Sequence, residues 1–207
     1  MKRLITGWIA IKVCGLALIW FLAFAGNAPQ AARGTEPTPT PTPKVDDSID
    51  RPTSDPYTGN LARFDRENRA EKLQIDRIMD ILEIKSGSFV ADVGAGGGWF
   101  SAIASKRVGK EGKVYAVDIR QDSVEYIDKR KVREGLTNIE TVLSTTDDPK
   151  LPERSVGAVV ILNTYHEISE PVKFLRNLKS GLKRGAFVGI IDREGKGDDH
   201  GIDQEVV

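Results

Sequence analysis

After residue 60 the apolar positions follow two different periods along the chain. An amphipathic helix is predicted over 65–83, because apolar residues recur there at helical spacing with charged residues between them. These apolar residues are Leu73, Ile75, Ile78, Met79 and Leu82. Short apolar runs that end in glycine, an acid or a polar turn predict strands instead. Five strands are expected, over 89–93, 113–118, 138–143, 158–162 and 186–191.

Helices are predicted between these strands, over 99–108, 121–133 and 170–182. Strands that alternate with helices through short glycine-rich turns indicate an α/β domain with a mostly parallel sheet. The run 158–162 is apolar at every position, which is typical of a central strand covered on both faces. We therefore expect one folded domain over 58–207.

Residues 1–25 are typical of a signal peptide or a membrane anchor. The uncharged apolar run 13–25 follows a basic start, and its length suits a signal peptide with cleavage after Ala25. The rival interpretation is a retained anchor that begins at Leu4 and contains Lys12, which costs about 2.5–3.5 kcal/mol at the centre of a spanning helix. In both interpretations the N-terminus engages the membrane or the export machinery. The rest of the chain is expected to be exported or membrane-anchored, on the periplasmic or other extracytoplasmic side.

Residues 26–57 form an expected linker that is rich in proline and threonine. It holds seven of the ten prolines, with a Pro-Thr alternation over 35–43. Proline fixes φ and lacks an N–H donor, so this run is expected to be an extended spacer.

The composition narrows the classes of function. The chain of 207 residues carries 30 basic and 30 acidic side chains, which argues against a nucleic-acid partner bound by a basic surface. One Cys and two His exclude an internal disulfide and a Cys-rich zinc site, and no metal site is expected. Two charged segments, 63–72 and the basic cluster 129–133, are interpreted as solvated helix surfaces.

A glycine-rich loop, Asp92-Val93-Gly94-Ala95-Gly96-Gly97-Gly98, joins the first predicted strand to a helix. In parallel sheets, ligands bind beyond the carboxyl ends of the strands, and glycine lets the backbone approach the ligand closely. The following helix presents unpaired N–H groups that favour an anion. The dinucleotide fingerprint G-x-G-x-x-G fails here, because Trp99 stands where its last glycine is needed.

Asp118 ends the second predicted strand, 24 residues after Gly94. A carboxylate at this place can accept hydrogen bonds from both hydroxyls of a ribose. A tight turn and a helix cap are the structural alternatives for the glycines and for Asp118. Taken together, at this spacing, the two features predict a nucleoside ligand.

Residues 62–192 resemble the superfamily of class I S-adenosylmethionine-dependent methyltransferases. Four motifs carry the resemblance, over 92–98, 114–118, 138–152 and 163–171. It implies a Rossmann-like, doubly wound sheet with strand order 3-2-1-4-5 and S-adenosylmethionine as cofactor. The family usually adds a C-terminal hairpin of two further strands, which is expected to be missing from the sequence up to Val207.

The resemblance also implies a binding role for particular residues. The glycine loop falls around the methionine part of the cofactor, Asp118 at the ribose and Asn163 at the site of methyl transfer. Thr145, Thr146 and Asp147 compete for the adenine, and Asp147 is favoured. The cofactor-binding residues so implied are Asp92, Gly94, Ala95, Gly96, Gly98, Asp118, Asp147 and Asn163.

The segment 163–167 follows the fourth predicted strand and carries the candidates for catalysis. A general base is needed only when the methyl acceptor must lose a proton. His166 has a suitable intrinsic pKa, and Glu167 could orient it or act as the base itself. A purely structural role for His166 is the alternative, and Tyr165 is a pocket wall or an acid.

The sequence thus predicts a methyltransferase that acts on a small-molecule acceptor. One alternative is an exported, noncatalytic protein that keeps the fold and binds S-adenosylmethionine or another nucleoside. Another alternative, a nicotinamide oxidoreductase, is disfavoured by Trp99.

Overall fold

The computed structural model describes residues 9–12, 53 and 55–192. Of the expected signal or anchor segment only residues 9–12 are described, and they form a strand that pairs with the edge of the sheet, which does not support that expectation. Most of the expected linker lies outside the described residues. The residues after Asp192, where a terminal hairpin was expected to be missing, also lie outside them. Among the described helices, none has the length and apolar character needed to cross a membrane.

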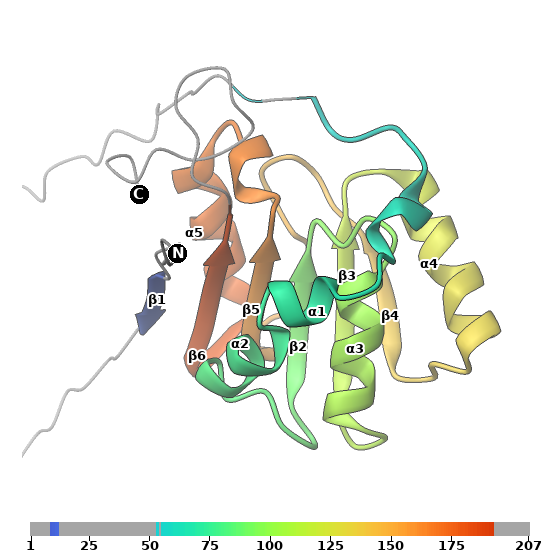
Figure 1. The fold of residues 1–207 in the computed structure, drawn as a ribbon. Coiled ribbons are helices and arrows are strands. Elements are labelled where there is room, and N and C mark those ends of the chain that lie inside the picture. Colours follow the sequence, from blue (N-terminus) through green and yellow to red (C-terminus); the bar gives the residue numbers. More distant parts are fainter. Residues whose placement is uncertain (1–8, 13–52, 54, 193–207) are drawn as a thin grey trace, which may run out of the picture.

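The described strands form one sheet in the order β1-β6-β5-β2-β3-β4 (Figure 1). Neighbours among β2 to β6 pair in parallel, whereas β1 pairs antiparallel with β6 at one edge. The five parallel strands confirm the predicted order 3-2-1-4-5 and the α/β class. The strands are β1 (Ile9–Lys12), β2 (Phe89–Val93), β3 (Lys113–Asp118), β4 (Ile139–Leu143), β5 (Val156–Leu162) and β6 (Leu182–Ile191).

The single helix expected over 65–83 is interrupted. Gln74 adopts a left-handed conformation with φ of 51°, and it separates α1 from α2. The other helices lie close to their predicted bounds, and two short 3-10 helices, η1 and η2, precede α1 and α5. The helices are η1 (Leu61–Phe64), α1 (Arg69–Lys72), α2 (Ile75–Ile81), α3 (Trp99–Val108), α4 (Gln121–Glu134), η2 (Tyr165–Glu167) and α5 (Pro171–Gly181).

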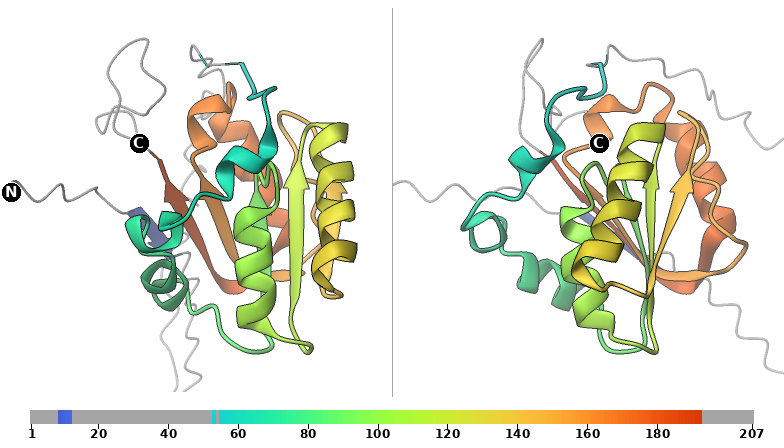
Figure 2. Two further views of the ribbon diagram at one scale, coloured as in Figure 1. Left: turned by 45° about the vertical axis from the view of Figure 1, so that its right-hand side comes forward. Right: turned by 90° about the vertical axis from the view of Figure 1, so that its right-hand side faces the viewer.

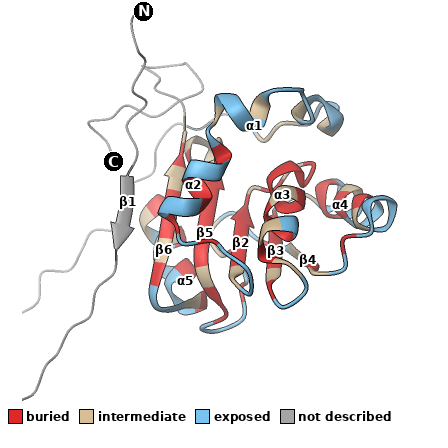
Figure 3. Ribbon diagram, turned by 60° about the horizontal axis from the view of Figure 1, so that its bottom comes forward, coloured by how far each residue is buried: buried red, intermediate tan, exposed pale blue. Residues whose placement is uncertain are grey.

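Helices cover both faces of the sheet (Figure 2). Side chains from α2, α3 and α4 pack with Val90 and Val114 on one face, and α5 packs with Ala91 and Val159 on the other. Neighbouring residues of a strand enter opposite clusters because successive side chains point to opposite faces. The central strands are accordingly buried, whereas the outer sides of the helices are exposed (Figure 3).

Because the five strands are parallel, their carboxyl ends meet at one edge of the sheet. The loops after β2, β3, β4 and β5 leave from this edge, and so does Asp192 after β6. Ligand sites of such sheets lie at this edge, which is where the predicted site residues gather.

Candidate active site

The glycine loop and the end of β3 are joined by hydrogen bonds to one carboxylate. The amide of Gly96 donates to Oδ2 of Asp118 at 2.7 Å, and the amide of Arg120 donates to Oδ1 at 3.0 Å. Asp118 is only 7% exposed, and burial raises the pKa of its carboxyl group, although these backbone hydrogen bonds oppose the rise. Each oxygen keeps acceptor capacity for a ligand hydroxyl.

Three glycines of the loop, Gly94, Gly96 and Gly98, have backbone conformations that residues with side chains rarely adopt. Gly94 has φ of +73°, and a Cβ there would overlap the side chain of Thr164. Gly96 has φ of +54°, but its Cβ direction points into open space. The first glycine therefore permits close packing of two loops, and the second leaves room beside Asp118.

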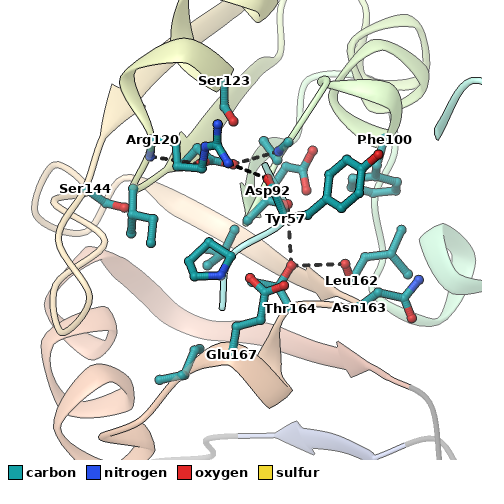
Figure 4. Close-up of a pocket in the computed structure, with 18 of the residues that line it drawn as sticks. Tyr57, Asp92, Phe100, Arg120, Ser123, Ser144, Leu162, Asn163, Thr164 and Glu167 are labelled. Atoms are coloured by element: carbon teal, nitrogen blue, oxygen red, sulfur yellow. Dashed lines mark hydrogen bonds between the residues drawn. The ribbon is translucent and has the colours of Figure 1, made fainter. Parts of the chain in front are cut away.

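A cavity lies between the glycine loop, the end of β3 and the segment after β5. In Figure 4, Arg120 and Ser123 lie on one side of it, and Thr164 and Glu167 lie on the opposite side. The cavity brings together most of the residues expected from the sequence, from three separate segments of chain. Those that line it are Asp92, Gly94, Ala95, Gly96, Asp118, Asn163 and Glu167.

Four expected site residues do not line this cavity, and His166, one of them, is described below with the catalytic candidates. Gly98 is the N-terminal cap of α3 and has a positive φ, and a Cβ there would press on Ile127, so Gly98 forms the turn into the helix. Tyr165 is buried in the hydrophobic cluster under α5, where it packs rather than faces a ligand. Asp147 forms an ion pair with Lys173 at 2.9 Å and accepts a hydrogen bond from Thr145.

The structure places other residues after β4 where Asp147 was expected. Ser144, Thr145 and Thr146 line the cavity in this region. The ion pair with Lys173 explains the difference, because it holds the carboxylate of Asp147 against α5. The two threonines were the rival candidates in the sequence.

Asp92 is the residue before the last of β2 and is 2% exposed. Burial raises the pKa of its carboxyl group to about 6, against the hydrogen bond that Ser101 Oγ donates to Oδ2 at 2.6 Å. Such a group favours a cationic partner, since a nearby positive charge restores the ionised form.

Arg69 of α1 lies at the side of the same cavity. Its guanidinium stacks over the ring of Trp99, with 4.2 Å between the guanidinium carbon and the ring centroid, and donates to the carbonyl of Phe64. Burial lowers the pKa of Arg69, whereas Asp92 and Asp65 oppose this shift. The segment 63–72 is therefore not only a solvated surface, because it supplies a half-buried cation to the site.

Arg130 also departs from the sequence interpretation of the basic cluster 129–133. It is 8% exposed, and its Nη1 donates to the carbonyl of Gly97 at 3.0 Å and to Asp65 Oδ1 at 2.8 Å. Arg130 thereby ties the glycine loop to α4 and to the segment before α1. It is a structural support of the loop rather than a member of a solvated face.

The segment after β5 carries the catalytic candidates. Nδ1 of His166 lies 2.9 Å from Oδ1 of Asp192, and the backbone amide of His166 donates to Oδ2 of Asp192 at 3.0 Å. Nε2 of His166 lies 3.9 Å from Oε1 of Glu167. His166 does not line the cavity of the glycine loop, but it lines a neighbouring cavity together with Glu167.

Of the catalytic candidates Tyr165, His166 and Glu167, Glu167 lines both cavities. Burial raises the pKa of its carboxyl group to about 7; His166 lowers it, and Asp118 and Asp192 raise it further. A carboxylate with this pKa can accept a proton near neutral pH. The sequence placed Glu167 here correctly, but it did not indicate Asp192, which stands at the end of the fifth parallel strand.

Comparison with known proteins agrees with this arrangement. Residues 90–185 match the family described as "Methyltransferase domain". A solved structure of a SAM-dependent methyltransferase from Aquifex aeolicus is 33% identical, with a TM-score of 0.61. The similarity covers 67% of this chain and 74% of that protein. The chain belongs to the family of S-adenosylmethionine-dependent methyltransferases.

The curated relatives carry the names of different methyltransferases. The aklanonic acid methyltransferase DauC of Streptomyces sp. strain C5 is 30% identical over 120 residues, which are 58% of this chain and 50% of that protein. The ubiquinone/menaquinone biosynthesis C-methyltransferase UbiE of Idiomarina loihiensis is 25% identical, over 67% of this chain and 58% of that protein. The chain thus spans about half the length of the curated relatives it matches.

Membership of this family assigns S-adenosylmethionine to the chain as its cofactor, and the residues of the cavity fit that molecule. Asp118 offers two carboxylate oxygens for the ribose, and Gly96 leaves space beside them. Asp92 and Arg69 offer charges of opposite sign for the amino and carboxylate groups of the methionine part. Ile119, which is 40% exposed, lines the cavity and offers an apolar surface for the adenine.

Proposed function

We propose that the protein transfers the methyl group of S-adenosylmethionine to a small-molecule acceptor. The observation that carries this proposal is that the first cavity is lined by both Asp118, the proposed ribose acceptor, and the carboxyl group of Glu167. The curated relatives with small-molecule names support the same class of acceptor. The alternative of a noncatalytic binding protein is not favoured by these relatives.

The cofactor supplies an electrophilic methyl group when it is bound. The protein's part is to hold the two reactants in line, since positioning supplies much of the rate acceleration in such a displacement. Asp118, Asp92 and the glycine loop bind and orient the cofactor. The second cavity, which shares Asn163 and Glu167 with the first, admits the acceptor.

Glu167 and His166 act on the proton of the acceptor in this proposal. Glu167 faces both cavities, so it can take the proton from the atom that becomes methylated. His166, held by Asp192, lies next to Glu167 and can pass the proton on or take it directly. The acceptor is therefore a hydroxyl, an acidic carbon or a protonated amine.

Calorimetric titration of the full chain with S-adenosylmethionine, and with NAD as a control, tests the cofactor. We expect S-adenosylmethionine to bind and NAD not to bind. When a panel of hydroxyl-bearing and amine-bearing small molecules is then added, we expect at least one of them to cause the release of S-adenosylhomocysteine. Absence of heat with S-adenosylmethionine would sink the proposal.

We also propose that the domain acts on the extracytoplasmic side of a membrane. The support is the basic, then apolar, sequence of residues 1–25 and the Pro-Thr spacer that follows it. Two reporters fused in turn after Val207 test this proposal, one that is active only after export and one that is active only in the cytoplasm. The proposal is contradicted if the cytoplasmic reporter is active and the export-dependent reporter is not.

A further inference from the structure

The second cavity beside the cofactor site has a distinct charge pattern. It lies between the segment 55–73 and the loop after β5, and it shares Tyr57, Phe64, Arg69 and Glu167 with the first cavity. Four cationic side chains line it on the side of α1, against three carboxyl groups. The cations are Arg63, Arg66, Arg69 and Lys72, and the acids are Asp55, Glu67 and Glu167.

The charge balance of this cavity is more positive than the count suggests. The side chain of Glu167 is 24% exposed, and partial burial raises the pKa of its carboxyl group to about 7, so that it is partly protonated near neutral pH. Arg63 stacks on Tyr57, and Arg69 stacks on Trp99, so both guanidinium groups have fixed positions. The lining therefore offers a net positive field to a molecule that enters it.

Two of these cations have no side-chain partner within the described part of the chain. The side chains of Arg66 and Lys72 make no hydrogen bond or ion pair there, although acidic residues are common on the same segment. Unpaired cations are also found on open surface, but Arg66 and Lys72 differ from those because they line a cavity. Arg66 and Lys72 therefore remain available to an anionic ligand.

We propose that the methyl acceptor carries an oxyanion, a carboxylate or a phosphate, which Arg66 and Lys72 bind at the mouth of this cavity. The inference rests on the proposed function, because it makes the second cavity the acceptor site. The oxyanion end of the acceptor lies against α1, and its proton-bearing end reaches Glu167 and His166 at the opposite wall. Guanidinium and ammonium groups recognise both kinds of oxyanion by charge-assisted hydrogen bonds.

Three probes that differ only in the group offered to the cations test this assignment. They are 4-hydroxybenzoate, 4-hydroxyphenyl phosphate and the neutral 4-hydroxybenzamide, and each is titrated by ligand-observed NMR into the full chain with and without S-adenosylhomocysteine. We expect at least one oxyanion to bind about fivefold more tightly than the amide, with an advantage that shrinks at high salt. The oxyanion with the smaller dissociation constant shows whether the acceptor carries a carboxylate or a phosphate.

A pair of double variants separates the cavity from general charge effects. R66Q together with K72Q should abolish the preference for the oxyanion and leave the affinity for the amide unchanged. K106Q together with K110Q removes the same charge from the far end of α3 and the turn after it, away from the ligand edge of the sheet. This control should change neither the preference for the oxyanion nor the affinity for the amide. Thermal unfolding confirms that both double variants are folded.

The outcomes distinguish this inference from the proposed function. Equal affinities for the acid, the phosphate and the amide, or equal losses in the two double variants, overturn the oxyanion site. No detectable binding of either oxyanion overturns it as well. Failure of S-adenosylhomocysteine to bind, while the oxyanion preference persists in the protein alone, sinks the methyltransferase function and leaves the anion site standing.

Discussion

Asp192 accepts two hydrogen bonds from His166, one from the backbone amide at 3.0 Å and one at the ring nitrogen Nδ1, 2.9 Å from Oδ1. The two side chains are 8% and 4% exposed, so water does not compete effectively for this contact. When Nδ1 carries the proton, the lone pair of Nε2 is the one that faces Glu167. The carboxylate thus sets both the position and the tautomer of the imidazole.

Replacement of Asp192 by Asn is expected to disturb the tautomer of His166 while leaving the fold in place. We expect kcat to fall about 10-fold or more, with the affinity for S-adenosylmethionine unchanged, because the amide stabilises the imidazolium less well than the carboxylate does. The ring nitrogens of His166 report this directly by nitrogen-15 NMR. The chain has two histidines, so the spectra are compared in a H200Q background.

A merely structural role for Asp192 predicts a different result. In that case D192N lowers the melting temperature and the cofactor affinity together, and the tautomer of the surviving His166 stays the same. Asp192→Glu is the conservative variant, and partial recovery of kcat in it supports the positioning role.

Glu167 should give the reaction a pH dependence with an inflection near neutrality. Its carboxyl group has a pKa of about 7 because it is buried, and a base acts only in its deprotonated form. The value of kcat/KM is therefore expected to rise as pH increases through about 7 and then level off. E167Q should remove this inflection and lower kcat/KM by about 10²- to 10⁴-fold.

The neighbouring Glu170 offers a matched control for this experiment. It is half-exposed and pairs with Lys173 at the surface, so E170Q should keep both the rate and the inflection. If the inflection survives in E167Q, the base is another group, and the same profile measured on H166Q then shows whether it is His166.

Much of the fold could be predicted because its signals are local. The five parallel strands are short apolar runs, and their order follows from the resemblance to a known superfamily. The break at Gln74 could not be predicted from the sequence pattern, since no glycine or proline marks it. Helix α2 buries three apolar residues in the core whereas α1 buries none, and no local pattern records this difference.

The site shows the same division between local motifs and long-range contacts. Asp118 and the glycine loop belong to motifs of fixed spacing, whereas Arg69 is held in the site by contacts with Trp99 and Phe64 that no motif records. Asp147 was the favoured adenine residue, but Lys173 of α5 draws it away. Asp192 carried one usable signal, since it directly follows a parallel strand whose carboxyl end meets the ligand edge.

Asp118 is expected to decide the affinity for the cofactor. D118A removes both acceptors for the ribose and also the partner of the Gly96 amide, so the affinity for S-adenosylmethionine should fall about 10- to 100-fold. D122N serves as the control, because Asp122 is an exposed acid next to the same cavity and pairs with Arg120. An unchanged dissociation constant in D118A would refute the ribose role.

Asp92 should leave a signature in the pH dependence of stability. Its pKa is about 6 in the folded protein because of burial, above the ordinary value of 3.8, so the folded state holds its proton more tightly than the unfolded state does. The stability from this group is complete below about pH 4 and is lost as pH rises through about 6. D92N cannot ionise, so the loss should disappear. Relative to the unmodified protein, its free energy of unfolding should rise by on the order of 2–3 kcal/mol between about pH 4 and pH 7.

Urea unfolding at a series of pH values measures this difference. The contribution of Glu167, whose pKa is also raised, is present in both proteins and cancels in the comparison. D76N is the matched control, because the side chain of Asp76 is 89% exposed, and it should follow the unmodified protein at every pH. A constant difference between D92N and the unmodified protein from pH 4 to pH 7 would show that Asp92 stays ionised in the folded state. Its role would then be that of a fixed negative charge beside the cofactor, held by Ser101.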